Sequence, residues 1–239
     1  MKADAPLALT VENVVKTFPS GDGRTYALKG ATLDARLGEM LMIVGPSGCG
    51  KTTLLSVICG TLNCDEGKIH VFDHDLRAMS DAAITRFRCQ NVGFIFQQFN
   101  LIPTLTALEN ASIPLILNGK KSSAAQRRSR EVLATLGLED KIHSYPAQLS
   151  GGQQQRVAIS RALVHEPRLI ICDEPTASLD AATGHKTMEL LKASALQADR
   201  AVIVVTHDSR IFSFADRIAE MEDGRVTGIH NDPKNYHHA

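Results

Sequence analysis

The sequence lacks the features that mark several broad classes of protein. Lysine plus arginine and aspartate plus glutamate number 26 each, so no excess of positive charge points to nucleic acid as a partner. No apolar run approaches the ~20 residues that a membrane-spanning helix needs, and residues 1–6 are too polar for a secretory signal. We therefore expect a cytoplasmic protein without a nucleic-acid partner.

The cysteines also fit a cytoplasmic protein. They number five, which is odd, and their spacing matches no metal-binding pattern. Cys59 and Cys172 stand in apolar runs, where a thiol serves as a small core side chain. Internal repeats and low-complexity segments are absent as well. With 239 residues, 44% of them hydrophobic, the chain suits one compact α/β domain, with or without an inserted subdomain.

The most informative stretch is residues 45–53, which fit the pattern G-x-x-x-x-G-K-[ST]. The apolar run 39–44 before it predicts a strand, and residues 52–60 after it predict a helix. In that context the backbone N–H groups and the helix dipole bind phosphate, which disfavours a chance match in a glycine-rich loop. The predicted ATP-binding residues are Gly45, Pro46, Ser47, Gly48, Cys49, Gly50, Lys51, Thr52 and Thr53.

Within this stretch the side chains have separate expected roles. The Lys51 ammonium would contact the β- and γ-phosphates, and Thr53 would reach the phosphates further back. The Thr52 hydroxyl would bind Mg²⁺.

Two further runs, 168–174 and 201–206, are apolar without alternation, as in a parallel sheet covered on both faces. Function gathers at the carboxyl ends of such strands. Asp173 fits a carboxylate that holds Mg²⁺ beside Thr52, and Glu174 fits a general base for the attacking water. His207 would contact the γ-phosphate. Taken alone it is more often a structural histidine, but its place at a third strand end favours catalysis.

The remaining segments predict how the rest of the chain is built. Residues 7–18 and 27–37 predict strands of a small β-layer, and Phe18 either stacks on a base or belongs to the core. Residues 101–138 have a helical pattern and no buried-strand runs, which indicates a helical insertion. The basic run 127–130 within it is interpreted as the solvated face of a helix. Residues 217–226 predict a closing hairpin, and the polar tail 231–239 is expected to be loose.

Residues 149–153 form a second predicted anion-binding helix start, because a serine and two glycines precede a helical run. One nucleotide does not need two such loops from one subunit. We therefore expect this loop to serve the nucleotide of another subunit. A simple capped helix start is the alternative; it explains Ser150 but not the two glycines that follow.

Taken together, these motifs resemble the ATP-binding cassette (ABC) ATPases over residues 7–228. The resemblance implies an α/β fold: a P-loop NTPase (RecA-like) core with an N-terminal antiparallel β-layer and an inserted α-helical subdomain. It also implies a single domain over 1–239, with the core at 7–97 and 163–228, the helical signature subdomain at 98–162 and a loose tail at 229–239. The motifs that carry it are Phe18, residues 45–53, Gln97, residues 149–153, residues 169–174, Ser178-Leu179-Asp180 and His207.

The resemblance further implies a head-to-tail homodimer that holds two ATP molecules with Mg²⁺. Each nucleotide would lie between residues 45–53 of one subunit and residues 149–153 of the other, which we call the signature loop. Gln97 would act in catalysis beside Glu174, His207 and Lys51, and would join Thr52 and Asp173 at the metal. The residues expected to act on the neighbour's nucleotide are Ser150, Gly151, Gly152, Gln153 and Asp180.

Within the family, residues 94–103 and the sequence LSGGQQQR at 149–156 are similar to the lipoprotein-release, macrolide-export and adaptor-linked exporter ATPases. Such subunits work at the cytoplasmic face of the inner membrane, as peripheral partners of a permease with a periplasmic adaptor. Cys49 and Ser160 depart from the usual serine and alanine, but neither is a ligand position. The alternatives are an importer subunit, a regulatory ATPase that signals to cell-wall enzymes, and a soluble repair or translation ATPase. The last of these lacks support, because the chain has neither a coiled-coil insertion nor a second cassette.

Overall fold

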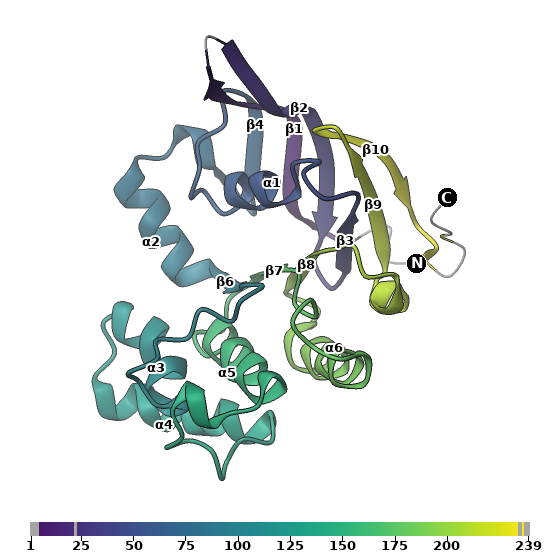
Figure 1. The fold of residues 1–239 in the computed structure, drawn as a ribbon. Helices are drawn as coiled ribbons and strands as arrows, with labels where there is room; N and C mark the ends of the chain where they lie inside the picture. The colour runs from purple at the N-terminus through teal and green to yellow at the C-terminus, as the bar shows by residue number, and fades with distance from the viewer. Residues whose placement is uncertain (1–4, 22, 234–235, 237–239) are drawn as a thin grey trace.

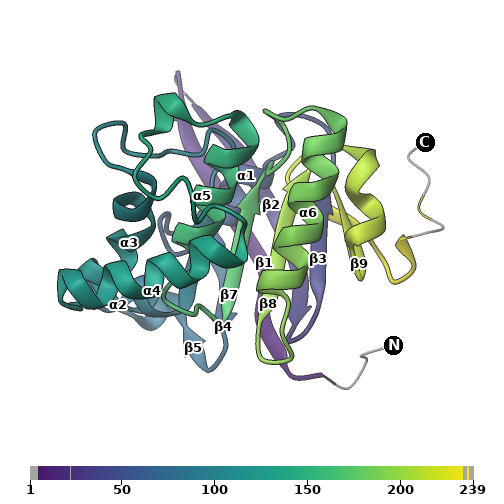
Figure 2. The ribbon, with the colours of Figure 1, turned by 90° about the horizontal axis from the view of Figure 1, so that it is seen from below.

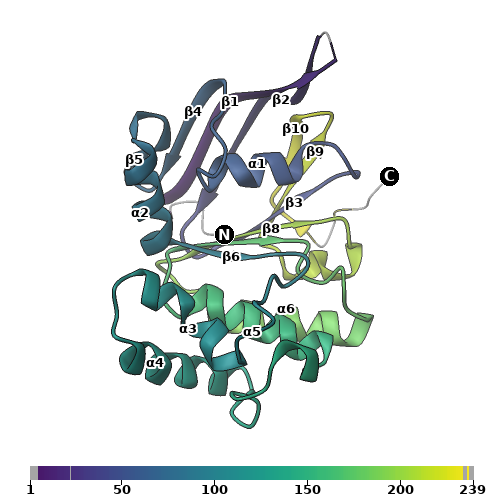
Figure 3. The same ribbon diagram turned by 60° about the vertical axis from the view of Figure 1, so that its left-hand side comes forward.

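The computed structural model describes residues 5–21, 23–233 and 236, and these form three layers. An antiparallel sheet lies above α1 (Lys51–Ile58), a mainly parallel sheet lies below it, and a helical layer lies beneath that sheet (Figures 1 and 3). This arrangement confirms the predicted α/β core with an antiparallel β-layer and a helical insertion. The boundaries predicted at residues 98 and 162 stay a prediction.

The antiparallel sheet has the strand order β2-β1-β4-β5. It is built from β1 (Leu7–Ser20), β2 (Gly23–Arg36), β4 (Glu66–Val71) and the short β5 (His74–Asp75). Asp65 joins the end of β1 to the start of β4, because its carboxylate accepts hydrogen bonds from Lys16 Nζ at 2.9 Å and from the backbone N–H of Thr17 at 2.7 Å. These bonds, that from Lys16 first, lower the pKa of Asp65 to about 2.

The second sheet has the order β10-β9-β3-β8-β7-β6, and all its neighbouring strands are parallel except β9 and β10. Every residue of β3 and β8 is buried, as the unbroken apolar runs predicted. The hairpin of β9 and β10 is confirmed and turns at residues 223–224. The six strands are β3 (Met40–Val44), β6 (Val92–Ile95), β7 (Leu169–Asp173), β8 (Ala201–Thr206), β9 (Arg217–Glu222) and β10 (Arg225–His230).

Several helices begin at side-chain caps that the sequence makes recognisable. Ser80 accepts a hydrogen bond from the N–H of Ala83, and Thr106 forms a reciprocal capping box with Glu109. The longer helices are α2 (Asp81–Asn91), α3 (Ala107–Leu117), α4 (Ser122–Thr135), α5 (Gly151–Leu163) and α6 (Ala181–Ala195). Short 3₁₀ turns occur at Leu76–Ala78, Pro146–Gln148 and Ser209–Phe214.

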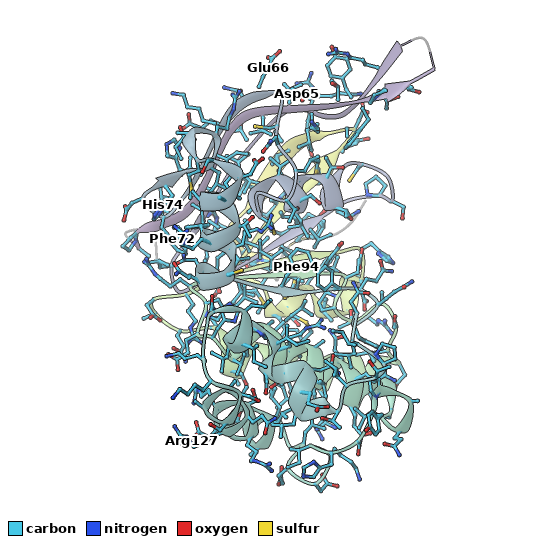
Figure 4. All side chains as sticks on the ribbon, turned by 90° about the vertical axis from the view of Figure 1, so that its left-hand side faces the viewer. Asp65, Glu66, Phe72, His74, Phe94 and Arg127 are labelled. Atoms are coloured by element: carbon cyan, nitrogen blue, oxygen red, sulfur yellow. The ribbon has the colours of Figure 1, made fainter. Side chains whose placement is uncertain are left out.

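The buried side chains form three clusters. One lies between the two sheets around α1, and a second lies under the parallel sheet against α5 and α6. The third is confined to the helical layer and includes Ala111, Leu133 and Val157. Arg127, labelled in Figure 4, is exposed, and Arg128 pairs with Glu131 and Glu166, which confirms a solvated face for the basic run on α4.

The tail differs in part from the expectation. Tyr236 is half-buried, and its ring centre lies 5.6 Å from that of Phe212, so this residue packs on the core and is not loose. An aromatic ring gains from burial even in a polar segment. Residues 234–235 and 237–239, on which the rest of this prediction falls, lie outside the described residues.

Candidate functional site

The loop between β3 and α1 is fixed by the parallel sheet on one side and by the β1–β2 layer on the other. Gly50, the N-cap of α1, has φ 104°, and a Cβ atom there would overlap the carbonyl oxygen of Ala27. The helix has no side-chain N-cap bond and no acidic residue in its first turn. Its first N–H groups are therefore available to an anion, as the motif predicted.

Lys51 is held inside this loop. The residue is 8% exposed, and its Nζ donates hydrogen bonds to the carbonyl oxygens of Gly45 at 2.7 Å and Pro46 at 2.8 Å. The Cys49 sulfur lies 3.9 Å from the same nitrogen. An ammonium group has three donors, so these two carbonyl bonds fix its position and leave one donor for a ligand.

A hydroxyl and a carboxylate meet where β7 ends. Thr52 Oγ1 lies 3.4 Å from Asp173 Oδ2. Burial, followed by the charge of Glu174, raises the pKa of Asp173, while the Thr52 hydrogen bond and Lys51 oppose the rise. Oxygen donors of this kind, with phosphate oxygens, are what Mg²⁺ prefers. No group of three or more histidine, cysteine or acidic side chains that suits a metal ion occurs among the described residues.

The next residue, Glu174, points to another neighbour. Its Oε1 lies 2.7 Å from Nδ1 of His207, and its Oε2 is buried without a hydrogen-bond partner among the described residues. The backbone of Glu174 has φ 49°, which is uncommon for a residue with a side chain, and its N–H donates to the carbonyl of Val205 at 2.9 Å. Such strain and an unsatisfied buried oxygen are typical of a catalytic position.

These groups line one cleft of about 320 Å³. Gly45, Pro46 and Cys49 are not among the residues that line the cleft; Gly45 and Cys49 are buried, Pro46 is exposed, and the carbonyl oxygens of Gly45 and Pro46 accept from Lys51. Gln97, two residues after the end of β6, also lines the cleft. The predicted site residues that the cleft brings together are Ser47, Gly48, Gly50, Lys51, Thr52, Thr53, Gln97, Asp173, Glu174 and His207.

Phe18 and the signature loop are not part of this cleft. Phe18 is 40% exposed on β1, where it pairs with Thr25 in the register of β2, so it is not a core aromatic. Ser150 caps α5 in a reciprocal box with Gln153. A Cβ on Gly152 would collide with Thr183 of α6, next to the Asp180 N-cap, so the signature loop packs on the 178–183 segment of its own chain.

Sequence reasoning missed three residues that shape the site. Ala27 and Val205 line the cleft, but neither has a side chain that signals a role. Arg161 of α5 donates to the carbonyl oxygens of Phe99 at 2.7 Å and Asn100, which fixes the turn after Gln97. The arginine stands in an ordinary helical pattern, so the sequence gives no sign of this contact.

Comparison with known proteins decides the family. The family model described as "ABC transporter" matches residues 28–177. The chain belongs to the ABC transporter ATPase family. It binds nucleotide and is an ATPase, consistent with the cleft. Among the described residues, every helix is too short or too polar to cross a membrane.

The chain is similar to several ABC proteins along most of its length. It is 42% identical to the uncharacterized ABC transporter ATP-binding protein MJ0796 of Methanocaldococcus jannaschii over 91% of this chain and 94% of that protein. A dimeric MJ0796 structure bound to ADP and Pi matches with a TM-score of 0.86 at 41% identity, covering 93% of this chain and 98% of the other. The cbiO1 protein of Clostridium perfringens, part of the cbiONQ complex, matches with a TM-score of 0.84 at 30% identity, covering 95% and 89%. Relatives from Mycobacterium tuberculosis are longer, and the chain spans 66% of their length.

Proposed function

We propose that this ABC ATPase works as a homodimer around two ATP molecules and drives export or extraction of a substrate through a separate permease. The observation that carries the proposal is the division of the motifs. Lys51, Thr52, Asp173 and Glu174 converge on one cleft, whereas the signature loop at Ser150 lies outside it. A loop suited to an anion but displaced from its own nucleotide site suits the nucleotide of a second copy.

Within each site, the residues divide the work by geometry. The loop N–H groups and Lys51 hold the phosphates, and Thr52 with Asp173 would hold Mg²⁺, which neutralises charge on the β- and γ-phosphate oxygens. Gln97 would complete the metal site from the end of β6. The free Oε2 of Glu174 is the atom suited to accept a proton from the attacking water.

His207 serves the same step in this proposal. An ionised carboxylate only accepts hydrogen bonds, so Nδ1 of His207 donates to Glu174. This bond orients both side chains and would leave Nε2 of the ring to contact the γ-phosphate. Gly151, Gly152, Gln153 and Asp180 would complete the neighbour's site together with Ser150.

The dimer is testable with the variant Glu174→Gln, which keeps the side-chain shape and removes the base. ATP should bind and stay, and because it contacts both subunits it should stabilise their association. We expect a dimer only with ATP, measured by size-exclusion chromatography with light scattering. Adding Ser150→Arg should abolish the dimer by blocking the neighbour's site, and adding Lys51→Ala should abolish it by losing the nucleotide. A Glu174→Gln protein that stays monomeric in saturating ATP would contradict the proposal.

The permease contact is proposed at a groove of about 140 Å³ between the core and the helical layer. Apolar residues of β6 and α3 line it, and Leu117 among them is 71% exposed; Phe94 is labelled in Figure 4. The rest of its lining is Cys89, Arg161, Ala162 and His165. We assign it to a short cytoplasmic helix of the permease, which would place this chain at the cytoplasmic face of the membrane. The likeness to cbiO1, part of a multi-protein transporter complex, supports such a partner.

The sequence alone predicts a different docking surface, the segment 97–110, because it places the apolar Phe99, Leu101 and Ile102 beside Gln97 and predicts that all three are exposed. Ile102 is 42% exposed, but Phe99 is half-buried and Leu101 packs against the core of the helical layer. Co-purification from detergent-solubilised membranes would identify the partner. A permease with an adaptor indicates an exporter, and cell-wall enzymes indicate the regulatory alternative.

A further inference from the structure

Gln155 lies in the second turn of α5 and is fully buried. Its Nε2 donates a hydrogen bond of 2.9 Å to the carbonyl oxygen of Pro175. Its Oε1 is also buried and has no hydrogen-bond partner among the described residues. A buried oxygen without a partner disfavours the folded state, so this side chain is not chosen for the stability of its own burial. What distinguishes glutamine from an apolar side chain at this position is the hydrogen bond that it donates to Pro175.

The neighbouring side chains of α5 act locally. Gln153, Gln154 and Arg156 bond to backbone groups within residues 136–152, in the helical layer and the helix itself. Gln155 is the member of this run that reaches across to the segment after β7. The helix packs beside α6 below the parallel sheet (Figure 2). A shift of α5 would therefore move the Gln155 side chain relative to the Pro175 carbonyl.

The carbonyl oxygen that Gln155 binds belongs to the residue that follows Glu174, the proposed base. Pro175 follows Glu174 directly and has no N–H of its own to anchor it. The Glu174 carbonyl accepts from Ala177 N–H at 3.2 Å, and the Thr176 carbonyl accepts from Leu179 N–H at 3.0 Å. The Pro175 carbonyl between them is fixed from the other subdomain, by Gln155. Because Pro175 is bonded directly to Glu174, a shift of the Pro175 backbone would be passed to the left-handed backbone of Glu174 and displace its side chain.

The geometry points to Gln155 as a positioning residue that links the two ATP sites of the dimer, an inference that rests on the proposed function. The amino end of α5 serves the partner's nucleotide through Ser150, Gly151 and Gly152. Its second turn holds the peptide beside Glu174, which serves the chain's own nucleotide. Binding of the partner's nucleotide to the amino end of α5 therefore fixes the position of Glu174, which acts on the chain's own nucleotide.

The test is Gln155→Met, which keeps the side-chain length and burial and removes the donor. We expect kcat for ATP hydrolysis to fall by roughly tenfold to a hundredfold, the scale of a small misplacement of a catalytic group. ATP affinity, measured by nucleotide titration, should change by less than about twofold, because the phosphate-binding loop is untouched. In the Glu174→Gln background the ATP-dependent dimer should persist.

A conservative variant separates positioning from folding. In Gln155→Glu, burial favours the neutral carboxyl, which can donate to the Pro175 carbonyl. The kcat of this variant, relative to that of the unchanged chain, should recover as the pH falls. The matched control is Gln126→Met, the same change at a half-buried position on α4, which should leave kcat unchanged.

Two results would overturn the role of Gln155: a Gln155→Met protein with unchanged kcat, or one that loses ATP binding and hydrolysis together without recovery in Gln155→Glu. A Glu174→Gln protein that never dimerises would instead overturn the dimer on which the inference rests. The two failures are thus distinguishable.

Discussion

At the scale of single residues, Phe18 is the predicted ATP contact that the cleft does not include. Its ring is 40% exposed, and Lys16 Nζ lies 5.7 Å from the ring centre. If Phe18 stacks on adenine, Phe18→Ala should weaken ATP binding by about 1 kcal/mol, or roughly fivefold, without affecting the fold. Nucleotide titration of the purified chain measures this. Tyr26→Ala, at a neighbouring residue that is 54% exposed, is the matched control. Equal affinity in Phe18→Ala would contradict stacking, and a loss in Tyr26→Ala would transfer the role to Tyr26.

The site residues at the strand ends could be predicted from the sequence. The residues that hold the neighbouring backbone in place could not. Asp173, Glu174 and His207 end or follow apolar runs, and parallel strands bring their carboxyl ends to one edge. Gln155 and Arg161 act on carbonyl oxygens of distant segments. Whether such a side chain reaches its acceptor depends on how α5 packs against the sheet, which no local pattern in the sequence records.

At the scale of elements, the groove between β6 and α3 makes a prediction about the partner. Leu117 is 71% exposed at the end of α3, and a buried charge in its place would disfavour docking of an apolar helix. Leu117→Glu should reduce co-purification of the permease and abolish transport, while basal ATPase activity persists because the cleft is unchanged. Leu7→Glu, a leucine that is 50% exposed on β1, is the control and should retain the partner. Equal recovery of the permease with both variants would exclude this groove.

The strands of the core were predicted because their burial is complete and their apolar runs are continuous. The exposure of Leu101, in the segment after β6, was predicted incorrectly. This segment has neither the alternation of a strand nor the repeat of a helix, so its sequence does not show which side chains face inward. Leu101 faces the helical core, and the Asn110 side chain bonds to Ile102 and Leu105. These contacts turn an extended apolar stretch inward, and they depend on the position of α3.

At the scale of the whole molecule, one ion cluster joins the two sheets. Arg217 on β9 contacts Asp34 on β2 and Glu39 before β3, each at 3.1 Å, with the Glu39 side chain 4% exposed. Burial, the largest cause, raises the pKa of Glu39, and the charge of Arg217 opposes the rise. Removing Arg217 would leave a buried carboxylate without its cation.

Arg217→Met should therefore lower the free energy of unfolding by about 3 kcal/mol at neutral pH. A carboxyl group whose pKa is raised in the folded state destabilises the fold when it is ionised. The loss should shrink as the pH falls from neutral into the acidic range, because the raised pKa of Glu39 lets this carboxyl take up a proton earlier than an ordinary glutamate. Urea unfolding at neutral and at acidic pH measures the difference from the unchanged chain. Adding Glu39→Gln should restore part of the stability at neutral pH, and a loss that does not depend on pH would contradict this account.

The position of α1 has a mechanical consequence. Leu54, Leu55 and Ile58 are fully buried between the two sheets, so the helix proposed to receive the phosphates moves only if both sheets move with it. The helical layer has its own small core and joins the parallel sheet through α5. In mechanical terms, α1 is the fixed support and the helical layer is the lever arm. In the proposed mechanism, a movement caused at the phosphates would therefore appear mainly in the helical layer, where α3 and α4 lie.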